Sequence, residues 1–250
     1  MRSLAGIVLL GLIPAALFGQ AHAQSAPHWG YEGDAGPQHW GDLEPDYAAC
    51  KSGTHQSPID IRNPQRTGLP QLTFDYHPVP LKIINNGHSI QVDYAPGSFI
   101  TVGTRKYQLI QFHFHHPSEE TINGHAYDMV AHLVHRDADG HLAVVAVLFK
   151  QGHANPLIQR LWDHLPMIVG SEMAVDSVRV SAADLLPGHT GYFTFDGSLT
   201  TPPCTEGVRW LVLSDPAEIS SAELHTLGSL YPNNARPTQP LNGRIVQESR

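Results

Sequence analysis

Six short segments of the chain carry the hydrophobic pattern of β-strands. Apolar and polar positions alternate in some of them, and others are continuously apolar, as expected for half-buried and fully buried strands. The segments span residues 81–84, 89–94, 107–115, 129–135, 142–149 and 208–213. The 22 glycines and 20 prolines among 250 residues indicate many turns between them. The pattern predicts one mainly β domain with short peripheral helices and long ordered loops.

Two helices are predicted from their capping signals. Residues 155–165 begin with Asn155, a residue type that caps helix N-termini, and Pro156 then fits the first helical position. Residues 220–230 offer Ser220 and Glu223 as a capping box. Both segments are short, so we expect these helices to lie at the edge of a β structure.

The N-terminus has the pattern of a secretory signal peptide. Arg2 gives a basic start, residues 4–18 are largely apolar, and Ala21-His22-Ala23 forms a small-residue cleavage pattern. A retained membrane anchor is the alternative, but the apolar stretch is shorter than the roughly 20 residues that a span needs. We therefore expect a signal peptide at residues 1–23, a single mature domain at residues 24–250 and a periplasmic location without stable membrane insertion.

The two cysteines, Cys50 and Cys204, are far apart in the sequence. An exported chain meets an oxidising compartment, where a disulfide closing so long a loop would remove about 4–5 kcal/mol of unfolded-state entropy in the chain-entropy model. Two buried free thiols or a metal-binding pair are the alternatives. The chain lacks a CxxC motif, so the disulfide is favoured.

The formal net charge of −8 excludes the usual electrostatic footprint of a nucleic-acid-binding protein. The chain also contains 17 histidines. Their number alone does not identify a site, because surface histidines are common. Their spacing is more informative.

A cluster of histidines occupies one predicted strand and its neighbour. Side chains alternate along a strand, so Gln111, His113 and His115 share one face, with Phe112, Phe114 and His116 on the other. An antiparallel neighbour at residues 129–135 would bring His132 opposite this face, whereas His135 would point away. Three neutral imidazoles can hold Zn²⁺ and leave a fourth position for water, which becomes a hydroxide nucleophile at neutral pH. A satisfied pair of sheet histidines and a cupin-like iron site are the alternatives.

Several motifs in a fixed order resolve these alternatives. They cover nearly the whole chain after the signal peptide: HWGY, QSPIDI, NNGHSIQV, QFHFHHPSEE, AHLVH, LAVV and GSLTTPPCTEGVRW. This combination resembles the α-class carbonic anhydrases of the bacterial, secreted type. The resemblance implies a large, twisted, mostly antiparallel sheet with a zinc ion at the base of a cone. It also implies reversible hydration of CO₂ to bicarbonate and a proton by zinc-bound hydroxide.

The resemblance assigns roles to individual positions. His113, His115 and His132 correspond to the zinc ligands. Thr200 corresponds to the residue that accepts the hydroxide's proton, and it needs Glu119 as an acceptor for its own hydroxyl hydrogen. The remaining positions have supporting roles: His88 as the proton shuttle; Tyr31, Asn86 and Gln91 around its water chain; Thr201 beside bicarbonate; Val134, Val144, Leu199 and Trp210 as the apolar wall for CO₂; Gln111 as an acceptor for a ligand imidazole; and Cys50 with Cys204 as the disulfide.

Three related positions depart from the family pattern. The family usually has a glutamate where this chain has Val130, a histidine bonded to that glutamate where it has Glu120, and a tyrosine in the same network where it has Phe195. We expect the Glu120 carboxylate to reach the space beside Val130 and accept a hydrogen bond from Nδ1 of His132. The alternative is a solvated Glu120, with His132 held by backbone or water. At the Gln91 position the family more usually has asparagine.

Two other functions remain open at this stage. A zinc-binding relative without strong catalysis could serve as a binding or storage protein, and an esterase could use the same hydroxide. Loss of a ligand or of the threonine–glutamate pair would favour the first, but all of these residues are present. The expected partners are therefore CO₂ and bicarbonate, with a homodimer as a further expectation and no nucleic acid.

Overall fold

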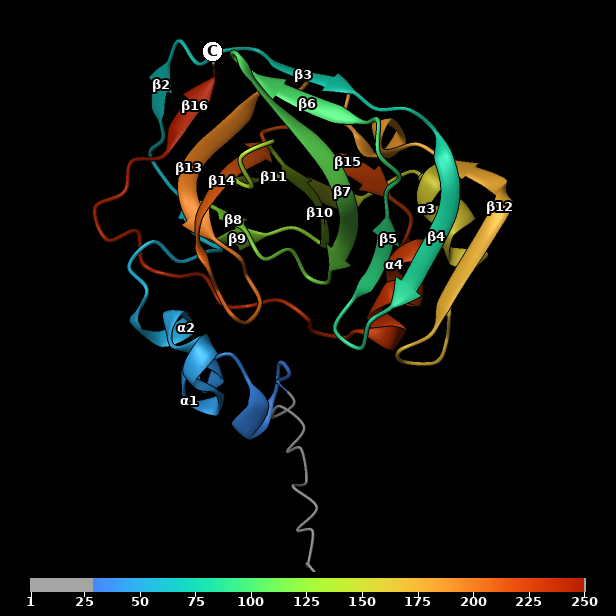
Figure 1. Cartoon of the computed structure of the whole chain (residues 1–250), viewed down its shortest axis with the longest axis horizontal. Coiled ribbons are helices and arrows are strands. Elements are labelled where there is room, and N and C mark those ends of the chain that lie inside the picture. The colour runs from blue at the N-terminus through green and yellow to red at the C-terminus, as the bar shows by residue number, and fades with distance from the viewer. Residues whose placement is uncertain (1–28, 250) are drawn as a thin grey trace, which may run out of the picture.

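The computed structural model describes residues 29–249, so the predicted signal peptide lies outside the described residues. Thirteen strands form one large, curved sheet (Figure 1). Ten of them follow one another across it: β12 (Glu172–Val180), β4 (Val79–Asn85), β5 (Ile90–Asp93), β7 (Arg105–His115), β10 (Met129–Arg136), β11 (Leu142–Gln151), β14 (Glu206–Leu213), β13 (Tyr192–Ser198), β16 (Gln247–Ser249) and β2 (Gln65–Thr67).

The remaining strands extend this sheet or form a small second one. On the large sheet, β15 (Ala217–Ile219) pairs with β11, and β6 (Phe99–Val102) joins β3 (Leu72–Asp75) to β7. Three strands form the small sheet: β1 (Asp60–Ile61), β8 (Thr121–Ile122) and β9 (His125–Ala126). Parallel pairs in the large sheet are β11 with β14, β11 with β15 and β16 with β2. The expected mainly β fold with a large, mostly antiparallel sheet is confirmed.

All six predicted strand segments fall in strands of the large sheet, namely β4, β5, β7, β10, β11 and β14. The sequence patterns missed the other seven strands of this sheet: the longer β12 and β13 and the short β2, β3, β6, β15 and β16. β12 lies at one end of the strand path and exposes most of its side chains, so it lacks the buried apolar positions that make a strand visible in sequence.

The two faces of the central strands support two different cores. Phe112 and Phe114 are fully buried in the larger core, on one face of β7. On the other face, Val130, Val144 and Trp210 belong to a second apolar cluster. Alternate residues of each strand thus separate a purely structural core from the face that carries the histidines.

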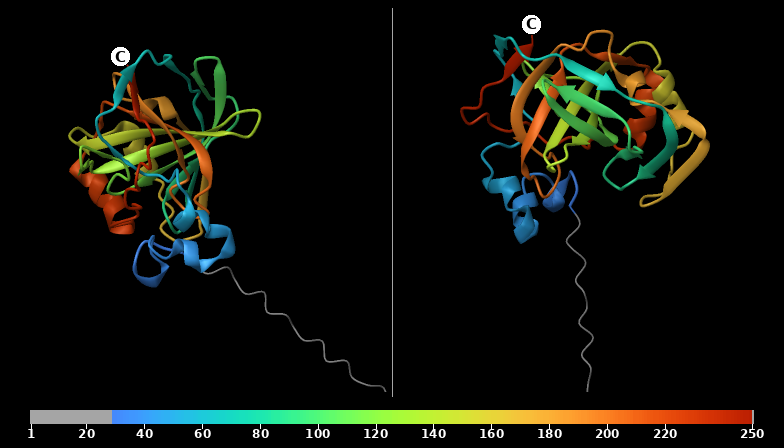
Figure 2. Two further views of the ribbon diagram at one scale, coloured as in Figure 1. Left: turned by 90° about the vertical axis from the view of Figure 1, so that its left-hand side faces the viewer. Right: turned by 45° about the horizontal axis from the view of Figure 1, so that its top comes forward.

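Short helices lie outside the sheet (Figure 2). The two predicted helices are confirmed as α3 (Pro156–Trp162) and α4 (Ser221–Leu230), with Asn155 capping α3 and the capping box present in α4. They pack beside the larger core, where Trp162 meets Phe114 edge-on at 5.3 Å between ring centroids. The others are α1 (Trp40–Leu43), α2 (Ala49–Ser52) and the 3₁₀ turns η1 (Gly33–Ala35), η2 (Pro45–Tyr47) and η3 (Ala182–Leu185). Within residues 29–249, no helix is long and apolar enough to cross a membrane.

The predicted disulfide joins Cys50 to Cys204 across 154 positions of sequence. Cys50 lies in α2, and Cys204 lies in the loop between β13 and β14. Both cysteines pack against the fully buried Trp40. The disulfide therefore fastens the N-terminal helices to the loop that follows β13.

His135 is a buried histidine that faces away from the other histidines of β10. It is 0% exposed, and its Nε2 lies 2.8 Å from the hydroxyl of Tyr76. Burial lowers the pKa of His135 to about 3. As the sequence predicted, this residue belongs to the structural side of the sheet.

The buried His135 predicts a measurable acid sensitivity. The folded state resists protonation of this imidazole down to about pH 3, whereas the unfolded chain takes up the proton near the ordinary pKa of 6.5. The stabilisation is therefore fully present above pH 6.5 and is lost as the pH falls toward 3. His135→Gln should reduce the loss of unfolding free energy between about pH 8 and about pH 5 by about 2 kcal/mol in urea titrations of the metal-free protein.

His125→Gln, at an exposed position of β9, serves as the control for this measurement. It should leave the pH dependence as it is in the wild type. An unchanged pH dependence in His135→Gln would contradict the prediction.

Candidate active site

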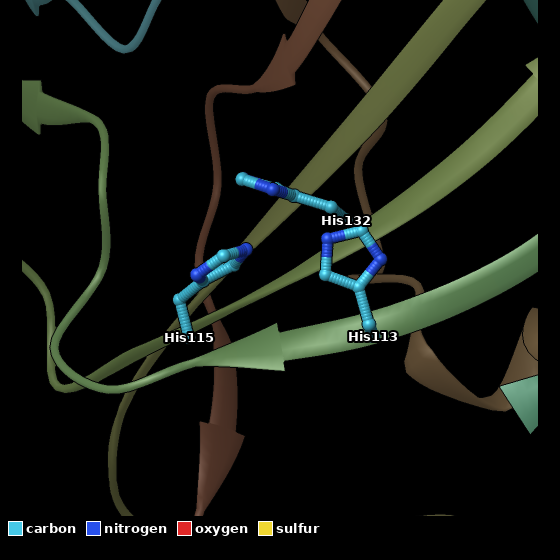
Figure 3. Close-up of side chains that lie close together, drawn as sticks. All are labelled: His113, His115 and His132. Atoms are coloured by element: carbon cyan, nitrogen blue, oxygen red, sulfur yellow. The ribbon is translucent and has the colours of Figure 1, made fainter. Parts of the chain in front are cut away.

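Strand register brings the three predicted metal ligands together. In the antiparallel pair of β7 and β10, His132 lies directly opposite His113, and Val130 lies opposite His115. Figure 3 shows the three imidazoles converging from these two strands. Their ring centroids are 4.7 to 5.5 Å apart, and one nitrogen from each ring lies within 4.8 Å of the others. The predicted cluster is therefore present.

Two of these rings are oriented by oxygen atoms that accept a hydrogen bond from Nδ1 of the ring. Nδ1 of His113 lies 2.8 Å from Oε1 of Gln111, and Nδ1 of His115 lies 2.7 Å from the backbone oxygen of Asn234. Since both partners are oxygens of amide groups, which accept here, Nδ1 carries the proton in each ring and Nε2 keeps its lone pair. Nε2 of His115 is buried and has no hydrogen-bond partner among the described residues. A metal ion would satisfy this atom.

The third ring, His132, is oriented by Glu120. Its Nε2 lies 3.1 and 3.2 Å from the two carboxylate oxygens. The contact expected between these residues is present, but the expected atom was wrong: the bond is made by Nε2, not by Nδ1. The ring turns its Nε2 toward Glu120 and its Nδ1 toward Glu119, whose Oε2 lies 3.8 Å away. Nδ1 is consequently the atom of His132 that is left for a metal.

The charges around the cluster suit a cation. Burial, reinforced by His132, lowers the pKa of His113 to about 3, and burial lowers the pKa of His115 well below its ordinary value. Both rings are therefore neutral lone-pair donors. Burial opposes protonation of His132 as well, but the carboxylates of Glu120 and Glu119 outweigh it and raise its pKa. Three imidazole nitrogens beside two acids form a donor set that fits a divalent transition metal such as Zn²⁺.

Glu119 lies between the histidines and Thr200. It is 2% exposed, and its Oε1 accepts a hydrogen bond of 2.8 Å from the backbone N–H of Arg236. Within residues 29–249, its Oε2 has no partner at hydrogen-bond distance. Burial raises the pKa of Glu119 to about 7, although the nearby His132 and the Thr200 hydroxyl act to lower it. The predicted threonine–glutamate pair is therefore brought together.

The loop that carries Thr200 is held by its own turn and by the disulfide. The backbone N–H of Leu199 donates to Thr205 O at 2.9 Å, and that of Cys204 donates to Thr201 O at 2.8 Å. The bond from Cys204 to Cys50 closes this turn onto α2. This arrangement fixes Thr200 and Thr201 relative to the sheet.

A buried arginine supports the same region from below. Arg236 is 2% exposed, and its guanidinium donates to Oε1 of Gln56 at 2.9 Å, to the Ser57 carbonyl at 2.7 Å and to the Cys50 carbonyl at 3.0 Å. Its own backbone N–H holds Glu119, as described above. One residue thereby links the disulfide to the carboxylate beside Thr200.

A cavity of about 120 Å³ opens from the histidines toward the surface. Its walls include nearly all the positions that the sequence assigned to proton transfer. These are Trp29, Tyr31, Asn86, His88, Ser89, Gln91, Gln111, His113, His115 and Thr201. The predicted metal site and the predicted shuttle thus share one water-accessible space.

The outer part of this cavity is lined by rings and amides. His88 stacks on Trp29 with centroids 3.6 Å apart and ring planes at 8°. Asn86 donates to Oε1 of Gln91 at 3.4 Å and accepts from the backbone N–H of His88 at 2.9 Å. The hydroxyl of Tyr31 is buried without a hydrogen-bond partner among the described residues.

The predicted apolar wall is also assembled. Strand register places Gln111, Val134, Val144 and Trp210 in one row across β7, β10, β11 and β14, next to the row that contains His113 and His132. Val134 and Leu199 pack against the cluster that contains Val144 and Trp210. The ring of Trp210 also meets His132 edge-on at 4.9 Å.

Sequence reasoning missed three residues of the site. Asn234 and Arg236 lie in an irregular segment more than 100 positions after the histidines, and Trp29 was recognised only as part of a motif. The two distant residues act through backbone atoms on His115 and Glu119. These two backbone contacts do not depend on residue type, and the segment lies outside every predicted strand and helix, so the sequence patterns did not point to either residue.

Comparison with known proteins agrees with this geometry. A family model described as eukaryotic-type carbonic anhydrase matches residues 35–250. A carbonic anhydrase of Nostoc sp. is 40% identical over 254 residues, which covers 100% of this chain and 96% of the relative.

Solved structures show the same relationship. A hyperthermostable carbonic anhydrase from a hydrothermal vent chimney superposes with a TM-score of 0.86 at 45% identity, covering 89% of this chain and 100% of that one. The α-carbonic anhydrase of Thermovibrio ammonificans, solved with the inhibitor sulfanilamide, gives a TM-score of 0.85 at 42% identity, with coverage of 88% and 98%. The resemblance found in the sequence motifs is confirmed, and the chain belongs to the eukaryotic-type carbonic anhydrase family.

Proposed function

We propose that this protein catalyses the reversible hydration of CO₂ to bicarbonate and a proton, with a zinc ion held by His113, His115 and His132. The observation that carries the proposal is the convergence of the three imidazoles, each fixed through its other nitrogen by Gln111, Asn234 or Glu120. Membership of the carbonic anhydrase family supports the substrate.

Zinc fits the donor set of three imidazoles at one end of a water-accessible cavity. When bound, it would lower the pKa of a coordinated water and so supply a nucleophile at neutral pH. The neutral state of His113 and His115 keeps their lone pairs available, since burial already prevents their protonation.

Thr200 and Glu119 orient the nucleophile. In this role, the Thr200 hydroxyl donates to Oε2 of Glu119, which has no other partner among the described residues. Its oxygen is then an acceptor, so the nucleophile must donate its proton to Thr200 and point a lone pair at the substrate. The bond from Arg236 holds Glu119 in place for this task.

The substrate is uncharged and offers little to a hydrogen-bonding site. The apolar wall described above suits CO₂, because apolar side chains can pack against it and do not hold water molecules in its place. This wall is formed by Val134, Val144, Leu199 and Trp210. Thr201, which lines the cavity, would contact the charged product, bicarbonate.

His88 moves the proton from the site to the solvent. It lines the same cavity as His113, and imidazole is the side chain best suited to proton transfer near neutral pH. Tyr31, Asn86 and Gln91 offer hydroxyl and amide groups along the way, and these can hold the water molecules that connect the two positions.

The protein is proposed to act in the periplasm after removal of residues 1–23, with residues 24–250 as the catalytic domain. The Cys50–Cys204 disulfide supports an oxidising compartment. A homodimer stays a prediction, to be checked by light scattering of the purified protein.

Zinc-loaded protein is expected to hold one zinc per chain and to hydrate CO₂ in a stopped-flow assay, with inhibition by sulfanilamide. His115→Ala should lose both the metal and the activity, while His125→Ala, at an exposed position of β9, should keep both. A zinc-loaded wild type that fails to hydrate CO₂ would reject the enzyme in favour of a binding protein. Faster turnover of an ester than of CO₂ would favour the esterase.

Replacing Thr200 by valine keeps the shape of the side chain and removes its hydroxyl. The loss of a hydrogen bond to a charged group, worth about 1.5–3 kcal/mol, should lower kcat/KM for CO₂ by roughly 10–100-fold. Zinc content should stay at one per chain, since Thr200 is not among the ligands. A kcat/KM equal to that of the wild type would remove Thr200 from the mechanism.

His88→Ala should lower kcat in dilute buffer by at least about tenfold, because proton export then depends on bulk water. The value of kcat/KM should stay close to that of the wild type, since CO₂ hydration itself precedes proton export. Added imidazole buffer should restore kcat. A variant with unchanged kcat in dilute buffer would show that protons leave by another route.

A further inference from the structure

We propose that Glu120 is a positioning residue for His132: it holds the ring with Nδ1 toward the other two imidazoles and keeps that nitrogen away from Glu119. The inference rests on the proposed metal site and goes beyond it, because it assigns a distinct task to each of two neighbouring acids. It concerns a carboxylate supplied from the loop after β7, rather than from β10 itself.

The carboxylate of Glu120 is buried, and the contacts that it makes are with His132. The residue is 0% exposed, and both of its carboxylate oxygens lie within 3.2 Å of Nε2 of His132. A carboxylate is strongly destabilised by burial unless it is paired and hydrogen-bonded. This carboxylate is therefore stabilised in the interior by the imidazole, and it fixes that imidazole in return.

The backbone beneath Glu120 is fastened on both sides. The Ser118 hydroxyl donates to the Glu120 carbonyl at 2.8 Å and accepts from the backbone N–H of Tyr127 at 2.8 Å. On the other side, Thr121 pairs with Asp60 in the small sheet. A carboxylate on such a support can hold a ring in one orientation.

The other side chains near His132 cannot replace Glu120. Val130 lies two residues earlier on β10, so it shares the face of His132, and it is fully buried in the apolar cluster. Phe195 belongs to the same cluster and stacks against Trp210, whose ring meets His132. None of the three has a hydrogen-bond acceptor for an imidazole N–H.

Glu119 is the competitor that makes this positioning necessary. Its Oε2 lies 3.8 Å from Nδ1 of His132, while Glu120 lies 3.1 Å from Nε2 on the opposite side of the ring. Two consecutive acids therefore approach opposite nitrogens of one imidazole. A modest turn of a ring released from Glu120 would let Nδ1–H donate to Glu119. That bond would remove a metal ligand and occupy the carboxylate that Thr200 uses.

The test is the rate at which zinc-loaded protein loses metal to excess EDTA, with protein-bound zinc measured by atomic emission. Glu120→Gln and Glu120→Ala should lose zinc about 10–100-fold faster than the wild type, with alanine the faster of the two because glutamine keeps an acceptor oxygen. Glu223→Gln changes a buried acid that caps α4, and it should lose zinc at the wild-type rate. Glutamine preserves the volume of Glu120, so the rate of zinc loss can be measured in Glu120→Gln even if Glu120→Ala fails to fold.

A second experiment moves the carboxylate. Glu120→His should lose zinc quickly, whereas Glu120→His combined with Val130→Glu should regain slow loss, because a glutamate at position 130 lies on the face of His132.

In the wild type, the ring N–H of His132 should give an NMR signal assigned to Nε2. In Glu120→Ala this signal should be lost or transferred to Nδ1.

Wild-type rates of zinc loss in Glu120→Gln would overturn the positioning role while leaving the metal site intact. A double variant that loses zinc as fast as Glu120→His would also overturn it. A wild type that binds no zinc would overturn the metal site itself, and the role of Glu120 with it.

Discussion

The antiparallel register of β7 with β10 is the constraint on which the site depends. Side chains alternate across a strand, so a slip of one residue would turn His132 into the apolar core and bring Leu133 opposite His113. The register is fixed by burial, because Phe112 and Phe114 must stay in the larger core when the histidines face the other side. The metal ligands are therefore positioned by the packing of residues that have no part in the chemistry.

Within that register, orientation is added separately to each ring. The acceptors come from three different places: the same strand for His113, the C-terminal segment for His115 and the loop after β7 for His132. Each acceptor uses one nitrogen and leaves the other for a metal. Strands thus place all three rings, and irregular segments orient two of them, His115 and His132.

The sequence predicts the placement of the three rings on their strands better than it predicts their orientation. Alternation along residues 107–115 and 129–135 was sufficient to predict both strands and the convergence of the ligands, because period and burial are local properties. The approach of Glu120 to His132 could also be expected, because positions 120 and 130 both differ from the residues that the family usually has there. The nitrogen of His132 that Glu120 contacts could not be predicted, because the orientation of this ring depends on its packing against Trp210 and the neighbouring strands. Asn234 and Arg236 were not found, because they reach His115 and Glu119 through backbone atoms from a distant segment without strand or helix periodicity. The contacts of their side chains likewise become visible only in the fold.

The contact between His115 and Asn234 has a consequence for the order of assembly. The two residues are 119 positions apart, and Asn234 lies near the end of the chain. Pairing β7 with β10 needs only a short loop to close, whereas fixing His115 needs a segment 119 positions further along the chain. A nascent chain can therefore build the strands that carry the histidines, and orient His113 and His132, long before it can orient His115. The metal centre becomes complete only when the chain extends as far as Asn234, so its capacity to select and retain an ion is a property of the folded domain and not of the emerging sheet.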